Sequence, residues 1–285
     1  MKYGVIDIGS NSVRLMISEN GNTLYKKLET TKLALGMKDG VLHDEAVERT
    51  VRAVSFFVKE AIDCGVDKVF AFATAAVRNA VNQKSFLDAV YNVCKIVVDV
   101  VDGVIESKIG AISALCGNDG GIIDVGGAST EIAVVSKGNL IYSKSVNVGS
   151  VRLTDIVNQD YVKANEYASS IINEFDKVSA RRFYAIGGTA TTIAAILQRL
   201  KVYEPEKVDG YVVTIKQLAE LTSRLYSLSV EERKNLTGLQ PGRADVIANG
   251  CAILLSVMRR LEIDCIVVSE KDNLEGYLIY QTENL

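Results

Sequence analysis

Hydrophobic and polar positions form two kinds of pattern along this 285-residue chain. Short runs rich in Val, Ile, Phe and Tyr predict β-strands, and apolar residues three or four positions apart predict helices between them. The first part of the chain predicts strands at 3–10, 12–18, 23–29, 68–74 and 95–101, and helices at 44–63, 84–94 and 105–115. Three strands followed by alternating helices and strands are typical of an α/β fold.

A similar order begins again at Gly120. After a strand–turn–strand pattern at 121–135, the sequence predicts a helix around 160–177, a strand at 181–188, a helix at 189–200, an irregular insertion, a helix near 243–261, a strand at 264–269 and a closing helix at 273–281. The second part of the chain therefore has the same α/β character as the first.

The two strand–turn–strand segments are related in sequence. GVIDIGSNSVRLMIS at 4–18 and GIIDVGGASTEIAVV at 121–135 align at a constant shift of 117 positions, which carries Asp7 onto Asp124. Other identical pairs at this shift are Gly4 and Gly121, Gly9 and Gly126, Ser12 and Ser129, Gly21 and Gly138, Asn22 and Asn139, Tyr25 and Tyr142, and Lys27 and Lys144. Identities on turn residues as well as core positions indicate a duplicated unit. We therefore expect two related α/β lobes, 1–117 and 118–285, each with a mixed sheet and flanking helices, that face each other across a cleft.

Composition narrows the class of protein. Hydrophobic residues make up 48% of the chain and charged residues 24%, which predicts a soluble globular protein. The longest apolar runs are too short to cross a bilayer and the N-terminus has no signal-peptide pattern, so we expect a cytoplasmic protein. The net charge of −3, without a block of basic residues, gives no indication of a nucleic-acid or membrane partner.

Cysteine and histidine give no sign of a zinc site. The cysteines are far apart, have no CxxC pair and lie in apolar segments, so we expect packed thiols; they are Cys64, Cys94, Cys116, Cys251 and Cys265. His43, the only histidine, opens a predicted helix and is expected at the surface.

The two Asp-x-Gly turns are the first candidates for chemistry. Asp7 and Asp124 each end a strand, and the glycines that follow let backbone N–H groups approach a ligand where a Cβ would clash. Carboxylates placed in this way suit Mg²⁺, which takes one or two of them together with waters and phosphate oxygens. The alternative is that both turns are ordinary tight hairpins in which the aspartate caps the turn.

Six motifs together carry a resemblance to a known family. They are DIGSNSVRLMI, ATAAVRNAVN, IDVGGASTE, VGSVRLTD, IGGTATTIAAI and GRADVIANGCAIL. In order and spacing they resemble the exopolyphosphatase / guanosine pentaphosphate phosphohydrolase (Ppx/GppA) family, within the superfamily of actin, sugar kinases and chaperone ATPases. The resemblance covers essentially the whole chain. It implies two actin-like (ribonuclease H-like) domains, dependence on Mg²⁺, and hydrolysis of a terminal phosphoryl group of inorganic polyphosphate or guanosine pentaphosphate.

The resemblance also implies roles for individual residues. Phosphate-binding positions fall in three glycine turns: Gly9, Ser10, Asn11 and Ser12; Gly126, Gly127, Ser129 and Thr130; and Gly187, Gly188 and Thr189. Asp124 and Glu131 match an acidic pair that holds the metal and orients water. Asp7 stays a further candidate metal ligand because of its position in the first turn. Arg78 matches an arginine that neutralises the phosphate chain. Two alternatives stay open: Arg78 pairs with a surface carboxylate, and the third turn serves helix packing.

The implied general base is Glu106, which aligns with a glutamate of the family pattern SGEEEAR. Here that run reads DGVIESK, so Val104 and Ile105 stand at two acidic positions. The alternative is that Glu106 only occupies a first helical turn, where negative charge is favoured. Ala128 in the second loop and Asp272 near the C-terminus also depart from the family pattern, which leaves substrate preference open.

The sequence leaves three candidate functions for this chain. The leading one is Mg²⁺-dependent hydrolysis of phosphoanhydrides, with Glu106, Arg78 and Glu131 as catalytic residues. The others are a non-catalytic binder of polyphosphate or alarmone, suggested by the altered acidic run, and an ATP-dependent kinase of the same superfamily. The chain is also a candidate homodimer.

Overall fold

The computed structural model describes residues 1–283, which fold into two compact units. Unit 1 comprises Met1–Ile109 together with the C-terminal segment that begins at Asn273, and unit 2 comprises Gly110–Asp272. This division differs from the expected lobes of 1–117 and 118–285, because the last helix joins unit 1 and the boundary falls inside a helix.

Unit 1 is built on a five-stranded sheet with the strand order β3-β2-β1-β4-β5. Its strands are β1 (Lys2–Ile8), β2 (Ser12–Glu19), β3 (Asn22–Thr30), β4 (Lys68–Ala73) and β5 (Asp99–Val100). The first three form an antiparallel meander, and β4 and β5 continue the sheet in parallel on the other side of β1. The central strand β1 therefore carries Asp7 close to its carboxyl end.

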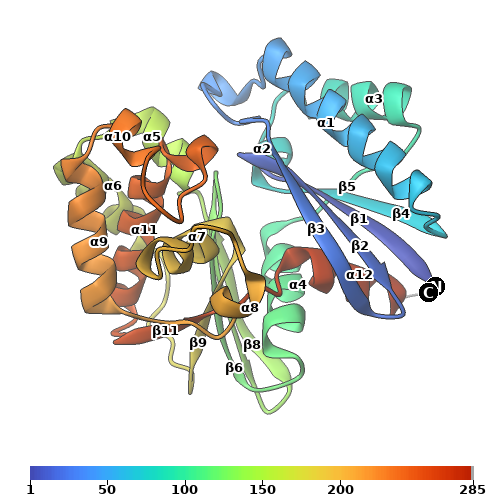
Figure 1. Ribbon diagram of the computed structural model, residues 1–285. Helices are drawn as coiled ribbons and strands as arrows, with labels where there is room; N and C mark the ends of the chain where they lie inside the picture. Colours follow the sequence, from blue (N-terminus) through green and yellow to red (C-terminus); the bar gives the residue numbers. More distant parts are fainter. Residues whose placement is uncertain (284–285) are drawn as a thin grey trace. The chain divides into compact units, whose positions relative to one another are not determined.

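Helices cover both faces of this sheet (Figure 1). They are α1 (Asp44–Asp63), α2 (Ala75–Arg78), α3 (Gln83–Cys94), the first half of α4 (Gly103–Leu115) and α12 (Asn273–Thr282), with a 3-10 turn η1 at Lys38–Gly40. On one face, Gly4 lets α1 approach closely, since a Cβ at Gly4 would lie 3.0 Å from the Cβ of Ala61. On the other face, Leu274 and Tyr277 of α12 pack with Val5. Gly4 and Val5 are neighbours in one strand, so they point to opposite faces.

Unit 2 is built on a six-stranded sheet with the order β10-β11-β9-β6-β7-β8. Its strands are β6 (Gly120–Val125), β7 (Thr130–Ser136), β8 (Asn139–Val146), β9 (Phe183–Ile186), β10 (Val212–Thr214) and β11 (Cys265–Val268). Again three antiparallel strands are followed by parallel ones, with β9 beside β6 and β11 beside β9. The short β10 closes the sheet in the antiparallel direction.

The two meanders repeat each other in register, which supports the predicted duplication. The β2–β3 ladder has an irregularity between Ile17 and Ser18, and the β7–β8 ladder has one between Val134 and Val135, the same positions at the shift of 117. Such a bulge bends a strand locally and is not dictated by hydrophobic alternation. The predicted fold class, two α/β units each with a mixed sheet and flanking helices, is confirmed.

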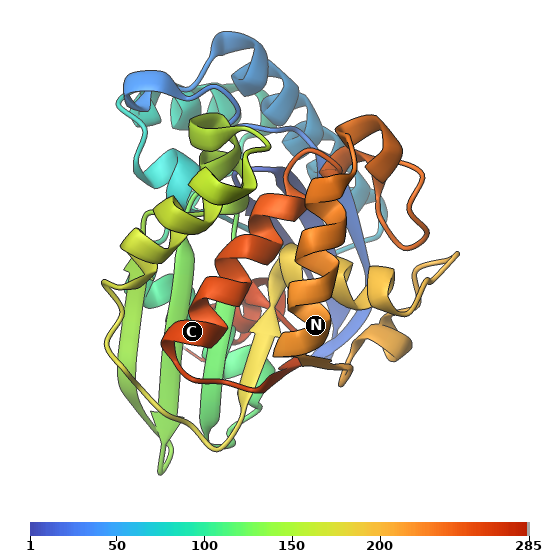
Figure 2. The same cartoon turned by 90° about the vertical axis from the view of Figure 1, so that its left-hand side faces the viewer.

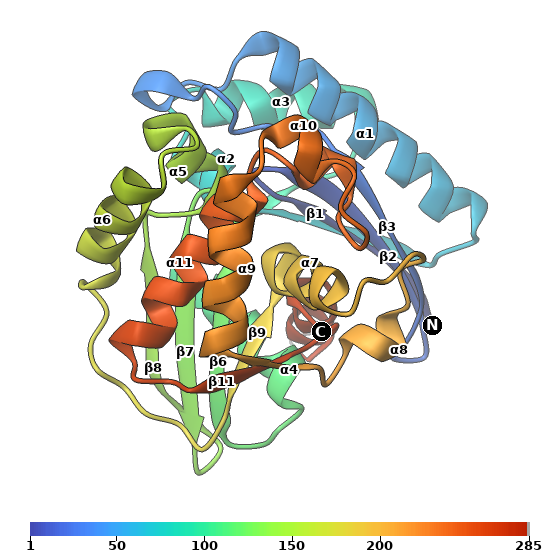
Figure 3. The ribbon, with the colours of Figure 1, turned by 60° about the vertical axis from the view of Figure 1, so that its left-hand side comes forward.

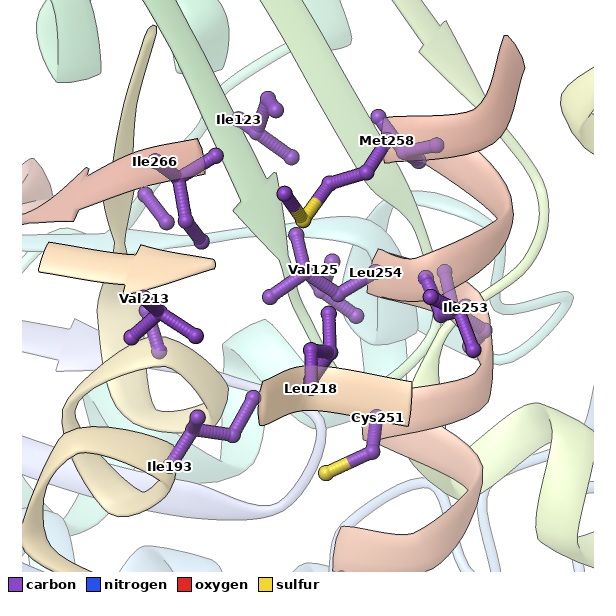
Figure 4. Packing of buried hydrophobic residues seen from close by; sticks show 14 of the residues in the cluster. Ile123, Val125, Ile193, Val213, Leu218, Cys251, Ile253, Leu254, Met258 and Ile266 are labelled. Atoms are coloured by element: carbon purple, nitrogen blue, oxygen red, sulfur yellow. The ribbon is translucent and has the colours of Figure 1, made fainter. Parts of the chain in front are cut away.

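The helices of unit 2 enclose a large apolar core. They are α5 (Ser150–Val157), α6 (Tyr161–Ile172), α7 (Gly187–Leu197), α8 (Pro205–Val208), α9 (Ile215–Ser227), α10 (Val230–Arg233) and α11 (Ile247–Arg260), with a 3-10 turn η2 at Pro241–Arg243. Helix α11 is central and contacts α5, α6, α7 and α9 (Figure 3). In Figure 2 it runs in orange-red across the green strands of the sheet. Figure 4 shows Leu254 and Met258 of α11 among Ile123 and Val125 of β6.

The second half of α4 covers the opposite face of the unit 2 sheet. Ala111 and Leu115 of α4 pack there with Ile122 and Ala133. Because Ile122 and Ile123 are consecutive in β6, they reach the two different cores. The sheet is therefore buried on both faces, as the continuous burial of β6 also shows.

Most predicted elements are present with shifted ends, and two predictions are wrong. The region after α7, predicted as an irregular insertion, contains α8, β10, α9 and α10. The strand predicted at 95–101 is reduced to Asp99–Val100, because Lys95 adopts a left-handed conformation that ends α3 and the following residues serve as a connection.

The prediction of packed cysteines is only partly right. All five are free thiols, but their exposure differs: Cys251 is buried, Cys64 and Cys94 are intermediate, and Cys116 and Cys265 are exposed. Cys116 follows α4 with a positive φ of 48°, so it belongs to a turn at the surface despite its apolar neighbours in sequence. Burial raises the pKa of the Cys251 thiol well above its ordinary range.

His43 lies at the surface, as predicted. It precedes α1, is exposed, and its ring Nε2 lies 2.6 Å from the carbonyl oxygen of Gly36. Residues 1–283 contain no group of three or more His, Cys, Asp and Glu side chains that could hold a metal ion. In the same part of the chain, no helix has both the length and the apolar character that crossing a bilayer would require.

Candidate active site

A pair of carboxylates lies where β6 ends and β7 begins in unit 2. Asp124 and Glu131 are direct partners in the antiparallel ladder, so both side chains leave the same face of the sheet. Glu131 is fully buried and Asp124 is 8% exposed. Ser145, the partner of Glu131 on β8, donates its hydroxyl to Glu131 Oε1 at 2.6 Å. Two adjacent buried carboxylates repel each other, so the arrangement favours a cation beside them.

The loop between β6 and β7 is held from behind by the start of α5. The amides of Ser150 and Val151 donate to the carbonyl oxygens of Gly126 and Gly127 at 2.9 and 2.8 Å. Gly149, which precedes α5, lies so close that a Cβ there would stand 2.5 Å from the nitrogen of Ala128. The first amides of α5 are therefore used to position the loop.

The loop itself presents amide donors on its other side. In a planar trans peptide, the carbonyl and the following N–H point in opposite directions, so the amides of Gly127 and Ala128 point away from α5. Neither amide donates a hydrogen bond to any of residues 1–283. Consecutive backbone donors of this kind form a concave site for an oxyanion.

The third predicted glycine turn begins α7 and lies against the acidic pair. Gly187 has a φ of +76°, and a Cβ there would stand 2.6 Å from Asp124 Oδ1. A Cβ at Gly188 would overlap the guanidinium of Arg243. Thr189 donates its hydroxyl to the last carbonyl of β6 at 2.7 Å, which fixes the helix to the sheet. The turn thus serves packing and also brings the positive end of α7 to Asp124.

Arg243 is a site residue that the sequence did not single out. It ends η2, and its guanidinium lies against Gly188 at the start of α7. A guanidinium is permanently charged and matches the geometry of phosphate oxygens. Arg243 belongs to the motif GRADVIANGCAIL, which could have marked it as a candidate site residue. The spacing of residues along the sequence, however, does not reveal that this segment contacts α7.

The loop between β1 and β2 in unit 1 is equivalent to the loop between β6 and β7, but a different segment of the chain holds it in place. The Gly9 amide donates to the Ser12 carbonyl at 3.0 Å, as Gly126 does to Ser129 at 3.0 Å in unit 2. The carbonyl of Ser10 accepts the amide of Ala34 at 2.9 Å, and that of Asn11 accepts the amide of Thr31 at 3.1 Å. The predicted phosphate-binding residues of each loop are thus held in turns of the same shape, braced in unit 1 by the chain after β3.

Asp7 and Asp124 have equivalent positions in the two units, but their ladder partners carry opposite charges. Arg14 stands across the ladder from Asp7, with its Nη2 2.5 Å and its Nε 3.0 Å from Asp7 Oδ2. Glu131 occupies the corresponding place beside Asp124. An arginine balances the charge of Asp7, whereas Glu131 adds to that of Asp124. Of the three predicted metal ligands, only the two in unit 2 form an acidic pair.

The two remaining predicted catalytic residues contact each other in unit 1. Arg78 ends α2, and its Nη1 lies 2.8 Å from Glu106 Oε2 and donates to the Val101 carbonyl at 2.8 Å. Glu106 is 6% exposed and lies in the first turn of α4, where Asp102 accepts the Ile105 amide at 2.7 Å. The carboxylate that pairs with Arg78 is therefore the candidate base and not a surface group.

A family model matches the sequence over nearly the whole chain. The model of the Ppx/GppA phosphatase family covers residues 6–284. This chain belongs to the Ppx/GppA phosphatase family. Membership confirms the predicted family and the predicted enzyme class, a phosphatase of phosphoric anhydrides. A solved structure of the Aquifex aeolicus Ppx/GppA family member has 28% sequence identity and a TM-score of 0.81, and the match covers 100% of this chain and 98% of that chain. The fold of this chain, two α/β units each with a mixed sheet and flanking helices, is therefore also that of the family member.

Three proteins with sequences similar to this chain differ in length and name. "Exopolyphosphatase 2" of Mycobacterium tuberculosis is 28% identical, over 96% of this chain and 97% of its own length. "Bifunctional 3-dehydroquinate synthase/phosphatase" of Fusobacterium nucleatum is 30% identical over 98% of this chain, which spans 46% of that protein. "Guanosine-5'-triphosphate,3'-diphosphate pyrophosphatase" of Pseudoalteromonas translucida is 25% identical over 92% of this chain, which spans 55% of that protein.

The acidic pair of this Ppx/GppA chain suits one particular class of metal ion. Its donors are carboxylate oxygens, without a sulfur or imidazole ligand in the same group, and hard oxygen donors suit Mg²⁺. Mg²⁺ keeps several waters and shares its remaining positions with substrate phosphates, so two carboxylates suffice. The residues of unit 2 therefore fit the predicted ion.

Proposed function

We propose that this chain hydrolyses the terminal phosphoanhydride bond of inorganic polyphosphate, with guanosine pentaphosphate as the second candidate substrate. Family membership supports the reaction class. The name of the Mycobacterium tuberculosis relative, whose length this chain almost matches, supports polyphosphate, and that of the Pseudoalteromonas relative supports a guanosine substrate.

The observation that carries the proposal is the convergence of three features in unit 2. The amides of Gly127 and Ala128, the acidic pair Asp124 and Glu131, and the start of α7 are adjacent elements of one site. The amides and the helix end bind phosphate oxygens. Arg243 adds a permanent positive charge beside Gly188.

Asp124 and Glu131 would hold Mg²⁺, assisted by the bond from Ser145 that fixes Glu131. When bound, the ion would draw negative charge from the phosphate oxygens and so favour displacement. We assign no such role to Asp7, because Arg14 already balances its charge.

Glu106 serves as the general base. It takes a proton from water as the water oxygen bonds to the terminal phosphorus, while the bridging P–O bond breaks and its electron pair remains on the shortened chain. Arg78 holds Glu106 in place through their ion pair at 2.8 Å. A positioned base contributes about 10²- to 10⁴-fold to the rate, and alignment and charge stabilisation supply the rest.

The test is phosphate release by the purified chain with Mg²⁺ and polyphosphate, pentaphosphorylated guanosine or ATP. Glu106→Gln should lower the turnover of polyphosphate at least about 10²-fold. Asp88→Asn, which removes an exposed carboxylate of α3 in the same unit, is the matched control and should leave turnover unchanged.

The other candidate functions give different outcomes in the same assay. Tight polyphosphate binding without phosphate release from any substrate would identify the non-catalytic binder. Turnover of ATP only with an added sugar or carboxylate acceptor would identify the kinase. Equal turnover by the wild type and Glu106→Gln would overturn the assignment of the base.

The homodimer and the cytoplasmic location stay predictions. Light scattering of the purified chain at several concentrations would decide the first, and fractionation of cells that express it would decide the second. Neither result alters the assignment of the site residues.

A further inference from the structure

A cavity lies in unit 2 at the carboxyl ends of α6 and α11. Its volume is about 320 Å³, and Ser169, Asn173, Lys177, Ser256, Arg259 and Arg260 contribute to its lining. Helices α6 and α11 pack side by side along their lengths (Figure 3). A cavity of this size is at the lower end of the range for small-molecule sites, which suits a small ligand.

Positive charge dominates this cavity, although the whole chain has a net charge of −3. Three of its lining side chains are cations, and none is an acid. Lys177 pairs with Glu262 at 2.5 Å, but both side chains are largely exposed, at 64% and 73%, so the pair contributes little. Among residues 1–283, neither Arg259 nor Arg260 forms an ion pair with an acidic side chain; their partners are carbonyl and amide oxygens.

The arginines are partly positioned in advance. Arg260 donates through Nε and Nη2 to the Phe175 carbonyl at 3.0 and 2.7 Å, which holds its guanidinium at the cavity wall. Arg259 has only a long contact of 3.4 Å, from Nη1 to Asn165 Oδ1. Cations are common at helix carboxyl ends, where they complement the dipole. That accounts for Arg259 and Arg260, which are both in the last turn of α11, but not for Lys177 around the same space.

The cavity also offers neutral hydroxyl groups. Ser256 is 4% exposed and donates to the Ala252 carbonyl at 2.9 Å, and its Oγ lies 3.5 Å from that of Ser169. Because Ser256 uses its one proton in the bond to Ala252, Ser169 is the hydroxyl that can donate to an oxyanion held by the cations.

We propose that this cavity is a second phosphate-anion site, separate from the acidic pair. Arg243 and the candidate active site lie near the start of α11, and the cavity lies at its end, roughly 20 Å away at the rise of an α-helix. The ligand is a phosphoryl oxyanion, either free orthophosphate or an internal segment of a condensed phosphate chain. The proposal does not depend on the hydrolytic function, because it concerns binding alone.

The test is an NMR titration of the arginine Nε–Hε signals in the full chain without Mg²⁺, so that hydrolysis does not enter. Orthophosphate and medium-length polyphosphate are titrated separately against sodium chloride of equal ionic strength. We expect saturable shifts of the Arg259 and Arg260 signals. In Lys177→Gln/Arg259→Gln, the affinity reported by Arg260 should fall at least tenfold. Both replaced side chains are exposed, so the variant should fold.

Lys163→Gln is the matched control, because Lys163 is an exposed cation at the opposite end of α6. It should leave the affinity unchanged. Saturation by orthophosphate alone would identify a free-phosphate site, and tighter saturation by polyphosphate would identify a site that holds the chain. Shifts that chloride reproduces, or an unchanged affinity in the double variant, would overturn the proposal.

Discussion

Replacing Gly187 with alanine tests whether the α7 turn acts on Asp124 or serves packing alone. Gly187 and Gly210 both have a φ of +76°. An alanine at either position is strained by about 1 kcal/mol after the gain from restricting the unfolded chain is subtracted. Nothing lies within 4 Å of a Cβ at Gly210, whereas a Cβ at Gly187 meets Asp124 Oδ1 at 2.6 Å. Gly210→Ala is therefore the matched control for backbone strain.

The magnitude follows from that distance. To restore ordinary contact, the Asp124 carboxylate has to move by about 0.8 Å. It is the end of a short side chain that is 8% exposed, so it moves as a unit at modest cost in stability. Misplacing a catalytic group by about 1 Å costs on the order of 10²-fold in rate. Gly187→Ala should thus lower kcat about 30- to 100-fold relative to Gly210→Ala.

The assays are phosphate release from polyphosphate and urea unfolding of both variants. The free energy of unfolding should differ between them by less than about 2 kcal/mol, because the overlap is relieved by one side chain. Equal activities would refute the reasoning and leave the turn as a packing element. A Gly187→Ala variant that is far less stable than the control, yet fully active per folded molecule, would also refute the proposed effect on Asp124.

Two further substitutions and one pH titration test the site and its surroundings. Ser145→Ala removes the donor to the buried Glu131 and should lower the free energy of unfolding by about 1–3 kcal/mol in urea titrations. Gly149→Ala places a Cβ against the Gly127 backbone, which cannot swing aside, so it should lower that free energy by at least about 1–3 kcal/mol and also reduce phosphate release. The pKa of Asp119 is held below its ordinary value because two backbone amides of the β7–β8 turn donate to it. Since its folded pKa is the lower one, its stabilising effect is present above the unfolded pKa and is lost as the pH falls through the folded pKa. An NMR titration of Asp119 with a midpoint at or above that of an unfolded peptide would contradict this.

The duplication made much of the fold predictable. Identities at turn positions such as Gly21 and Gly138 place the same meander twice, and the ladders agree down to the bulge. Helix α9 was readable but missed: Leu218, Leu221 and Leu225 are spaced three and four apart and all are buried. A capping box at its start, with reciprocal bonds between the cap and the third helical residue, was a second local signal.

Contacts between residues far apart in the sequence determine the features that could not be predicted. The helical pattern of α12 was predicted, but local sequence does not reveal that Tyr277 stacks on Phe72 at 4.4 Å between ring centroids and so belongs to unit 1. In the site, Glu131 was found through its motif. The role of Arg14 was not predicted, because the similarity of the two turns suggested equal roles for Asp7 and Asp124. Only the strand register shows that Arg14 lies opposite Asp7 and that Glu131 lies opposite Asp124. Arg243 depends on the same kind of distant contact.

The central claim is that the acidic pair of unit 2 holds a divalent cation beside the amide loop. Mn²⁺ as a paramagnetic substitute for Mg²⁺ tests it by NMR line broadening of assigned backbone amides. We predict broadening centred on Gly127, Ala128 and Gly187, lost in Glu131→Gln and unchanged in Asp88→Asn. Broadening that persists in Glu131→Gln, or that is centred on the loop after Asp7 instead, would contradict the account.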